Sequence, residues 1–156
     1  MTADRTRLAG PADVPTLVAL MTEFYAEADF PLPAAPATRA FAALLAAPQL
    51  GAVWLGEAGG APVGYAVLTL AFSMEYGGLR GFVDDLYVRP EARGRGVAAA
   101  LLGAVREACG ELGVRSLHVE VGPDNATARG VYTRAGFADS GHLLLTMPLA
   151  APVHAS

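Results

Sequence analysis

Two adjacent carboxylates and a glycine-rich turn lie within one short stretch of the chain. Asp84 and Asp85 belong to a run of strand-forming residues, and Gly94 and Gly96 follow within the segment RGRGVA at 93–98. Backbone N–H groups at a helix N-terminus that side chains leave uncovered bind phosphate groups. A nearby carboxylate can accept a proton from a substrate. This stretch therefore predicts a phosphorylated ligand next to a general base.

The elements that must position these residues follow from the spacing of apolar residues and from turn residues. Strands are predicted over 5–9, 52–57, 62–73, 80–88 and 116–121, with a further strand pair over 137–148. Helices are predicted over 14–28, 38–46, 97–112 and 125–135. This order predicts one mixed α/β domain over 3–149 with a single central sheet, followed by a frayed tail over 150–156.

The amino-acid composition and charge exclude several kinds of chemistry and disfavour some partners. The chain has 15 acidic and 11 basic residues, and every basic residue is arginine, which excludes a P-loop lysine and Schiff-base chemistry. The acidic balance disfavours nucleic acid as a partner. The single cysteine, Cys109, is expected to be buried, and the three histidines show no metal-site spacing. Without a membrane span or a signal peptide, the expected location is the cytoplasm.

The glycine turn also fits a dinucleotide fingerprint, G-x-G-x-x-[GA], as Gly94, Gly96 and Ala99, with Glu120 near the position of a ribose-binding acid. A Rossmann domain usually opens with this unit and then adds several βα units. Here three antiparallel-type strands precede the turn and only 36 residues follow Glu120. The dinucleotide interpretation is therefore disfavoured.

A different signature fits better. The segment 93–98 matches [QR]-x-x-G-x-[GA], and Asn125, Ala128 and Tyr132 match N-x-x-A-x-x-x-Y, followed by Gly136-Phe137. In these motifs, their spacing and the element order, the chain resembles the GNAT superfamily of acyl-CoA-dependent N-acetyltransferases across roughly 5–147. The resemblance implies a central mixed sheet of about seven strands flanked by about four helices.

The resemblance also implies an acetyl-CoA site between the strands 84–88 and 116–121, which splay apart in this family. Backbone groups of Leu86 and Val88 would pair with the pantetheine amides, and the turn would hold the pyrophosphate. The residues implied to contact the cofactor are Leu86, Tyr87, Val88, Arg93, Gly94, Arg95, Gly96, Val97, Ala98 and Asn125. Asn125 is equally suited to cap the following helix, and these two roles are compatible.

Two catalytic roles follow from the same resemblance. An amine must lose a proton before it attacks a thioester, and a carboxylate can accept that proton. Adjacent strand residues face opposite sides of the sheet, so Asp84 and Asp85 cannot both face the site unless a bulge intervenes. Polyamine acetyltransferases of the family carry such a pair and use its first acid, which favours Asp84 as the base. Asp85, Glu75 or a water molecule are the alternatives, and either aspartate can instead serve as a cap or an arginine partner.

Tyr132 is implied to protonate the departing thiolate, its alternative being a tyrosine that only packs the short helix. Tyr25, Glu75 and Asp85 are candidates to contact the acceptor, although the apolar stripe favours core packing for Tyr25, and Glu75 is equally suited to be a solvated hairpin residue. The expected function is transfer of an acetyl group from acetyl-CoA to a primary amine of a small, cationic acceptor, without a metal. The alternative is an acyl-CoA-binding sensor without turnover. A homodimer is included among the expected partners because this family is often dimeric.

Overall fold

A computed structural model describes residues 4–155 of the chain. Five strands form one sheet: β1 (Arg5–Leu8), β2 (Gly51–Ala58), β3 (Ala61–Ser73), β4 (Gly78–Val88) and β5 (Ser116–Val119). Their spatial order is β1-β2-β3-β4-β5, and all neighbours are antiparallel except β4 and β5, which run parallel. The four helices are α1 (Val14–Glu27), α2 (Ala34–Leu45), α3 (Val97–Leu112) and α4 (Ala126–Arg134). The predicted mixed α/β fold class is confirmed.

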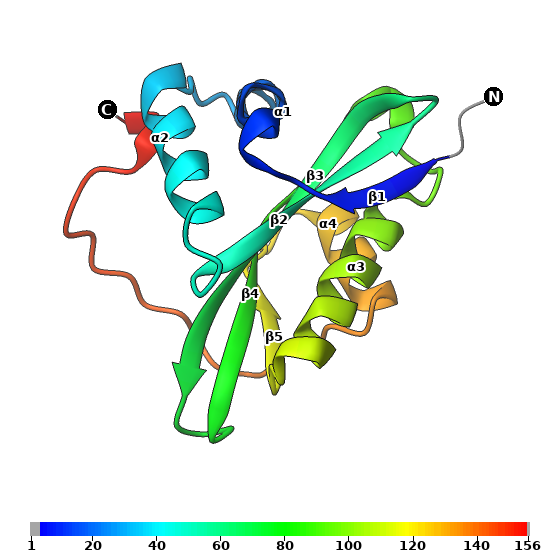
Figure 1. Cartoon of the computed structure of the whole chain (residues 1–156). Coiled ribbons are helices and arrows are strands. Elements are labelled where there is room, and N and C mark those ends of the chain that lie inside the picture. The colour runs from blue at the N-terminus through cyan, green and yellow to red at the C-terminus, as the bar shows by residue number, and fades with distance from the viewer. Residues whose placement is uncertain (1–3, 156) are drawn as a thin grey trace.

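Helices cover both faces of the sheet, so the chain has two hydrophobic clusters (Figure 1). Alternation along the strands separates them: Leu55 and Tyr65 face α1 and α2, whereas Trp54 and Ala66 face α3. Because both faces are covered, β2 and β3 are largely apolar on both sides. The sheet centre is therefore a rigid support for the residues at the end of β4.

Helix α3 is built as its apolar spacing predicts. Leu101, Val105 and Cys109 lie one turn apart and are buried against the sheet. The helix begins after Gly96 and ends before Gly113, and both glycines adopt the left-handed conformation. Cys109 is buried as expected, and burial raises the pKa of its thiol.

The predicted strand pair over 137–148 is wrong. Within the described chain no strand follows β5, so the sheet has five strands rather than about seven. The segment 138–149 instead runs as a wide exposed loop, because its apolar side chains reach neither hydrophobic cluster and its backbone finds no strand in its own sheet (Figure 1).

The tail also differs from expectation. Val153–Ala155 forms a short 3-10 turn, and the His154 ring lies 4.6 Å from the Phe30 ring, centroid to centroid. The tail is therefore packed onto α1 and the following loop instead of being frayed. The predicted domain start at residue 3 and the final residue 156 lie outside the described residues. Over the described part of the chain, no helix has the length and apolar character needed to cross a membrane.

Candidate active site

A β-bulge in β4 decides where the two aspartates lie. Val67 of β3 pairs with Asp85 and Leu68 pairs with Val83, so Asp84 is the extra residue between them. A bulge locally cancels strict alternation and redirects side chains. Both carboxylates consequently act on the same tyrosine: the charges of Asp85 and Asp84 contribute, after burial, to a raised pKa of Tyr25. The regular alternation that would turn only one of the two aspartates toward the site therefore does not apply to this pair.

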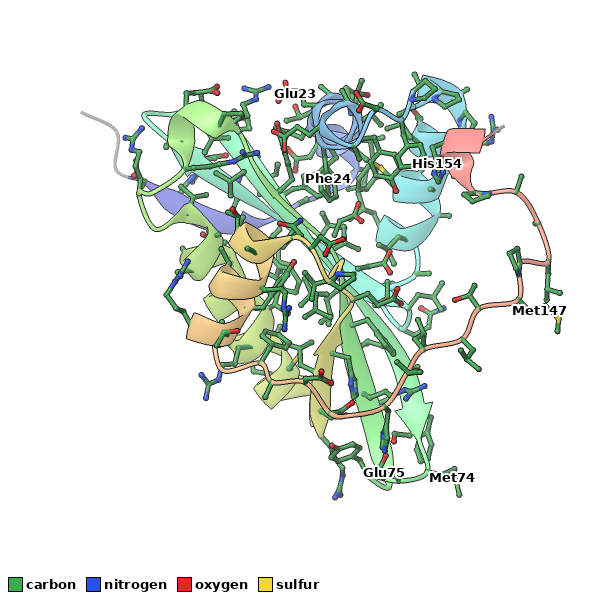
Figure 2. The ribbon with its side chains drawn as sticks, turned by 180° about the vertical axis from the view of Figure 1, so that it is seen from behind. Glu23, Phe24, Met74, Glu75, Met147 and His154 are labelled. Carbon is green, nitrogen blue, oxygen red and sulfur yellow. The ribbon has the colours of Figure 1, made fainter. Side chains whose placement is uncertain are left out.

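Asp85 lines a hollow of about 280 Å³ between α1, β4 and the C-terminal turn. The residues around it are Phe24, Tyr25, Ala28, Phe30, Asp85 and His154. The side chains of Phe24 and His154 lie at the same end of the molecule in Figure 2. The hollow is mostly aromatic with one carboxylate, which suits an organic cation.

The Asp85 carboxylate is held by one hydrogen bond. The fully buried Tyr65 donates its hydroxyl to Asp85 Oδ2 at 2.8 Å. Burial is the main cause that raises the pKa of Asp85 to about 7; the Tyr65 hydrogen bond opposes this rise, and the charge of Asp84 contributes to it. Asp84 is exposed by comparison, and desolvation raises its pKa as well. A carboxyl group that titrates near neutral pH is suited to act as a general base.

The sheet opens immediately beside these carboxylates. Parallel pairing of β4 with β5 ends at Val83 and Val119, while β4 continues to Val88. Arg89 donates its backbone N–H to the Val63 carbonyl at 2.7 Å, so alternation turns the backbone groups of Leu86 and Val88 toward the open side. The two residues expected to bind an amide chain therefore face the splayed strands. The side chain of Tyr87 is buried and stacks on Phe24 with ring centroids 5.4 Å apart.

The glycine turn leaves the N-terminus of α3 uncovered. Gly94 and Gly96 have φ values of 74° and 83°, and an added Cβ at either would meet no described atom within 4 Å. The first N–H groups of a helix have no acceptor within that helix, so Val97 and Ala98 present theirs to this opening. Beside it lies another hollow of about 260 Å³, which Arg95, Gly96 and Val97 help to line. Arg5 and the carboxylates of Asp4 and Glu57 line this hollow as well, so the candidate phosphate site rests on the uncovered N–H groups of the turn and not on the hollow as a whole.

Arg93 is already engaged in holding the turn. Its Nη2 donates to Glu27 Oε1 at 2.6 Å and its Nε donates to the Val88 carbonyl at 2.9 Å. A second arginine, Arg89, forms two 2.9 Å contacts with the carboxylate of Glu23 on α1. These ion pairs connect the turn to α1. The side chain of Arg93 thus positions the loop, while its backbone remains part of the candidate phosphate site.

The second signature lies on α4. Asn125 caps this helix, because its Oδ1 accepts the Ala128 N–H at 3.1 Å. Tyr132 packs edge-on against Phe137 with ring centroids 5.6 Å apart. Burial raises the pKa of Tyr132, and the charge of Asp85 contributes to the rise. The Tyr132 hydroxyl therefore lies within electrostatic range of Asp85 although the two residues are far apart in sequence.

Glu75 is not part of this arrangement. It lies at the exposed tip of the β3–β4 hairpin, whereas Phe24 and His154 lie at the opposite end of the molecule (Figure 2). The structure therefore brings Asp84, Asp85 and Tyr25 together but leaves Glu75 apart. In the described residues, no group of three or more His, Cys, Asp or Glu side chains has the arrangement of a metal site.

Two residues of the site were missed in the sequence. Tyr65 reads as an ordinary strand residue, and nothing local indicates its bond to Asp85 twenty positions later. His154 lies in a segment that resembles a frayed end, and only the return of the chain to α1 brings it to the hollow. Phe24 and Phe30 complete the aromatic lining of the hollow beside Tyr25.

Comparisons with known proteins extend this picture. The model of the acetyltransferase (GNAT) family matches residues 17–137. An aminoglycoside N(6')-acetyltransferase type 1 from Stenotrophomonas maltophilia is 30% identical over 152 residues, covering 94% of this chain and 95% of the relative.

Solved structures agree with the fold. An integron cassette protein, HFX_CASS3, from the mobile metagenome of Cole Harbour Salt Marsh is 57% identical, with a TM-score of 0.89 over 96% of this chain and 93% of that one. Aminoglycoside N-acetyltransferase AAC(6')-Iy, crystallised with CoA, has a TM-score of 0.81 at 18% identity, covering 96% of this chain and 97% of its own. The latter similarity concerns the fold alone.

Proposed function

Because the chain belongs to the GNAT acetyltransferase family, we propose that it transfers an acetyl group from acetyl-CoA to a primary amine of a small cationic acceptor. The transfer takes place by direct attack when both substrates are bound. The observation that carries this proposal is the β4 bulge, which sets the Asp85 carboxylate into an aromatic hollow beside the open edge of the sheet.

The cofactor half of the proposal is supported by backbone geometry. The glycine turn and the first turn of α3 offer uncovered N–H groups to a pyrophosphate. Leu86 and the N–H of Val88 face the gap between β4 and β5, where a pantetheine chain would pair with them, whereas the Val88 carbonyl is already bonded to Arg93. Solved relatives of the same fold were crystallised with CoA or acetyl-CoA, which supports the choice of ligand.

The acceptor half is supported by the hollow around Asp85. Phe24, Tyr25 and Phe30 offer ring faces to an ammonium group, and Asp84 and Asp85 offer negative charge. The 30% identical relative acts on aminoglycosides by name, and these are small molecules with several amines. We therefore propose an acceptor with two or more amino groups, of which one reacts and the others bind.

We assign the general base to Asp85 rather than to Asp84, which the sequence favoured. Asp85 lines the hollow, and its pKa of about 7 leaves it deprotonated at slightly alkaline pH yet basic enough to take a proton from an ammonium. The ammonium first loses one proton to solvent; the neutral nitrogen then bonds to the acetyl carbon, the C–S bond breaks, and the second proton passes from the nitrogen to Asp85. Tyr132 gives its hydroxyl proton to the departing sulfur, and Asp84 attracts the cationic acceptor.

The test is an amine panel with acetyl-CoA and detection of free thiol. The panel contains a diamine, a polyamine, an aminoglycoside, an amino acid and a peptide N-terminus. We expect thiol release with the polycationic members and little with the amino acid. Binding of CoA without thiol release for any amine contradicts the enzyme and favours the sensor, whereas thiol release only with the peptide contradicts the acceptor class.

A further inference from the structure

The hydrogen bond between Tyr65 and Asp85 joins a core side chain to the candidate base across two strands. Val67 and Asp85 are register partners on β3 and β4, so they share one face of the sheet, and Tyr65 lies two residues before Val67 on that face. A diagonal neighbour is within reach of a long aromatic side chain. Because the bulge at Asp84 sets this register, the same irregularity places Asp85 at the hollow and beside Tyr65.

The Tyr65 ring is held in place by other aromatic rings. Its side chain is fully buried, and its ring centroid lies 6.0 Å from that of Phe41 and 6.5 Å from those of Phe24 and Tyr87. A close-packed interior leaves such a ring little freedom to move. Burial, and after it the charge of Asp85, raises the pKa of Tyr65 well above its ordinary value, so the hydroxyl keeps its proton. Tyr65 is therefore a fixed hydrogen-bond donor.

The two oxygens of the Asp85 carboxylate are not equivalent. Oδ2 accepts the Tyr65 hydroxyl at 2.8 Å, whereas Oδ1 accepts no hydrogen bond from residues 4–155 and is not shut off from solvent. The terminal torsion of an aspartate is broad, so an unrestrained carboxylate exchanges its two oxygens by rotation. The bond from Tyr65 opposes this rotation. Oδ1 is therefore the oxygen that stays open beside the hollow.

We propose that Tyr65 is a positioning residue of the acetyl transfer: by holding Oδ2, it makes Oδ1 the oxygen that takes the proton from the acceptor nitrogen. This inference rests on the proposed function, whose base it orients. As the neutral nitrogen bonds to the acetyl carbon, one N–H bond breaks and its proton bonds to Oδ1. The electrons of the C–S bond leave with the sulfur, which takes the hydroxyl proton of Tyr132.

The other ionisable groups around Asp85 do not supply this orientation. They come from β4, α1, α4 and the C-terminal turn, and they are Asp84, Tyr25, Tyr132 and His154. The side chains that α2 adds to this cluster are apolar. In the described part of the chain, only Tyr65 donates a hydrogen bond to Asp85. This bond stabilises the charged carboxylate, so its removal should raise the pH at which Asp85 loses its proton.

The first test is Tyr65→Phe, which keeps the ring and removes only the hydroxyl. Rates are measured at several pH values with an amine that the panel identifies. We expect the midpoint of kcat/KM for the acceptor to move from about 7 upward by about one pH unit. On the alkaline plateau, kcat should fall about tenfold because the carboxylate can rotate away from the nitrogen. An unmoved midpoint or an unchanged plateau overturns the proposal.

Phe41→Leu is the matched control, because it removes a ring from the same buried cluster and leaves the Tyr65 hydroxyl in place. It should lower the Tm without moving the midpoint, and a midpoint that moves as far as in Tyr65→Phe overturns the proposal. A double variant separates action through Asp85 from a general loss of packing. Added to Asp85→Asn, Tyr65→Phe should lower kcat by less than a further twofold. A further loss of about tenfold there contradicts the positioning role.

Direct titration of the Asp85 carboxyl gives a readout that does not depend on turnover. NMR with ¹³C-labelled aspartate follows each carboxyl group over pH, and Asp85→Asn identifies the Asp85 signal by its loss. The midpoint of this signal should be higher in Tyr65→Phe than in the wild type, and equal midpoints overturn the proposal. An active enzyme with equal midpoints contradicts the role of Tyr65 alone. Absence of thiol release with every amine instead contradicts the proposed function, and the positioning role with it.

Discussion

The two halves of the candidate site are built in opposite ways. The phosphate-binding half uses the backbone of a few consecutive residues, the turn before α3, with no side chain required at Gly94 or Gly96. The acceptor half uses side chains that come from α1, β3, β4 and the last residues of the chain. One half is local in sequence, and the other exists only after the chain has folded.

This difference predicts which half of the candidate site tolerates amino-acid substitutions. A backbone site depends on left-handed glycines and on the start of one helix, so it survives most substitutions in the surrounding sequence. The acceptor half depends on Tyr65, Asp85 and His154, each of which a single substitution removes. We expect members of this family to keep the first half and to vary the second, and the following variants test the two halves separately.

The largest effect is expected in the acceptor half. Asp85→Asn removes the proposed base and should lower kcat by about 10²–10⁴-fold, the usual contribution of general base catalysis. In the wild type, kcat/KM for the acceptor should rise with pH through about 7, as the Asp85 carboxyl loses its proton. Steady-state kinetics at several pH values measures the kcat of the variant and the pH profile of kcat/KM in the wild type. Asp84→Asn is the matched control, and a larger loss there than in Asp85→Asn returns the base to Asp84.

Replacement of Asp85 should lower kcat but raise the stability of the fold. The folded pKa of Asp85, about 7, lies above its ordinary value of 3.8, so the folded state favours the protonated form. The contribution of the protonated Asp85 carboxyl to the free energy of unfolding is fully present below pH 3.8. It is lost as the pH rises through 7, by at most roughly 4 kcal/mol. Asp85→Asn should therefore raise the Tm at pH 8 more than at pH 5. Equal changes in Tm at both values contradict the raised pKa.

Tyr132 is tested by removal of its hydroxyl. Tyr132→Phe should lower kcat by about 10²-fold, the low end for a general acid, with CoA affinity changed less than about twofold. Thiol release measures kcat, and calorimetric titration with CoA measures affinity. Tyr76→Phe, on the exposed hairpin, is the control. An unchanged kcat leaves Tyr132 with a packing role on α4.

The local half is tested at Gly96. Gly96→Val places a β-branched residue at φ 83°, which costs about 1–2 kcal/mol, and its side chain enters the opening above α3. CoA binding should weaken about tenfold or more by calorimetry. Gly103→Val, at an exposed α3 position where a Cβ also meets open space, should bind CoA normally. Normal affinity in Gly96→Val contradicts the phosphate site.

The smallest effect is expected at the packed C-terminal turn. His154→Ala removes a ring contact with Phe30 and Tyr25, and aromatic contacts contribute about 0.5–1.5 kcal/mol. The KM for the acceptor should rise about two- to tenfold while kcat stays within twofold. His142→Ala, in the exposed segment 138–149, should change neither KM nor kcat. An unchanged KM in His154→Ala removes the tail from the acceptor site.

Much of the fold was predictable because its signals are local. The boundaries of α3 follow from Gly96, Gly113 and the apolar stripe between them, and β4 follows from its strand-forming run. The strand pair predicted over 137–148 does not form, although alternating leucines are typical of a strand. Alternation shows that a segment is suited to a sheet but not which strand it joins, and in the described residues this segment pairs with no strand.

The candidate site likewise contains residues that a local motif indicates and residues that only contacts between distant segments bring together. The segment 93–98 and the residues Asn125 and Tyr132 were identified from short motifs that resemble those of the family, because phosphate binding and helix capping act over a few residues. Whether Asp84 or Asp85 enters the hollow depends on a bulge, which is a property of two paired strands and is absent from either strand's sequence. The separation of Glu75 from the pocket likewise follows from the length of the hairpin that carries it.

By itself the sequence determined the four helices, the strands up to β5, the glycine turn before α3 and the residue types available for catalysis, since these follow from backbone preference and short spacing. Only the tertiary structure decided that Asp85 lines the hollow, that Tyr65 bonds to it and His154 lies beside it, and that the described segment 138–149 pairs with no strand. These depend on contacts between residues far apart in the chain. Their positions are set by packing and strand register, which no local pattern records.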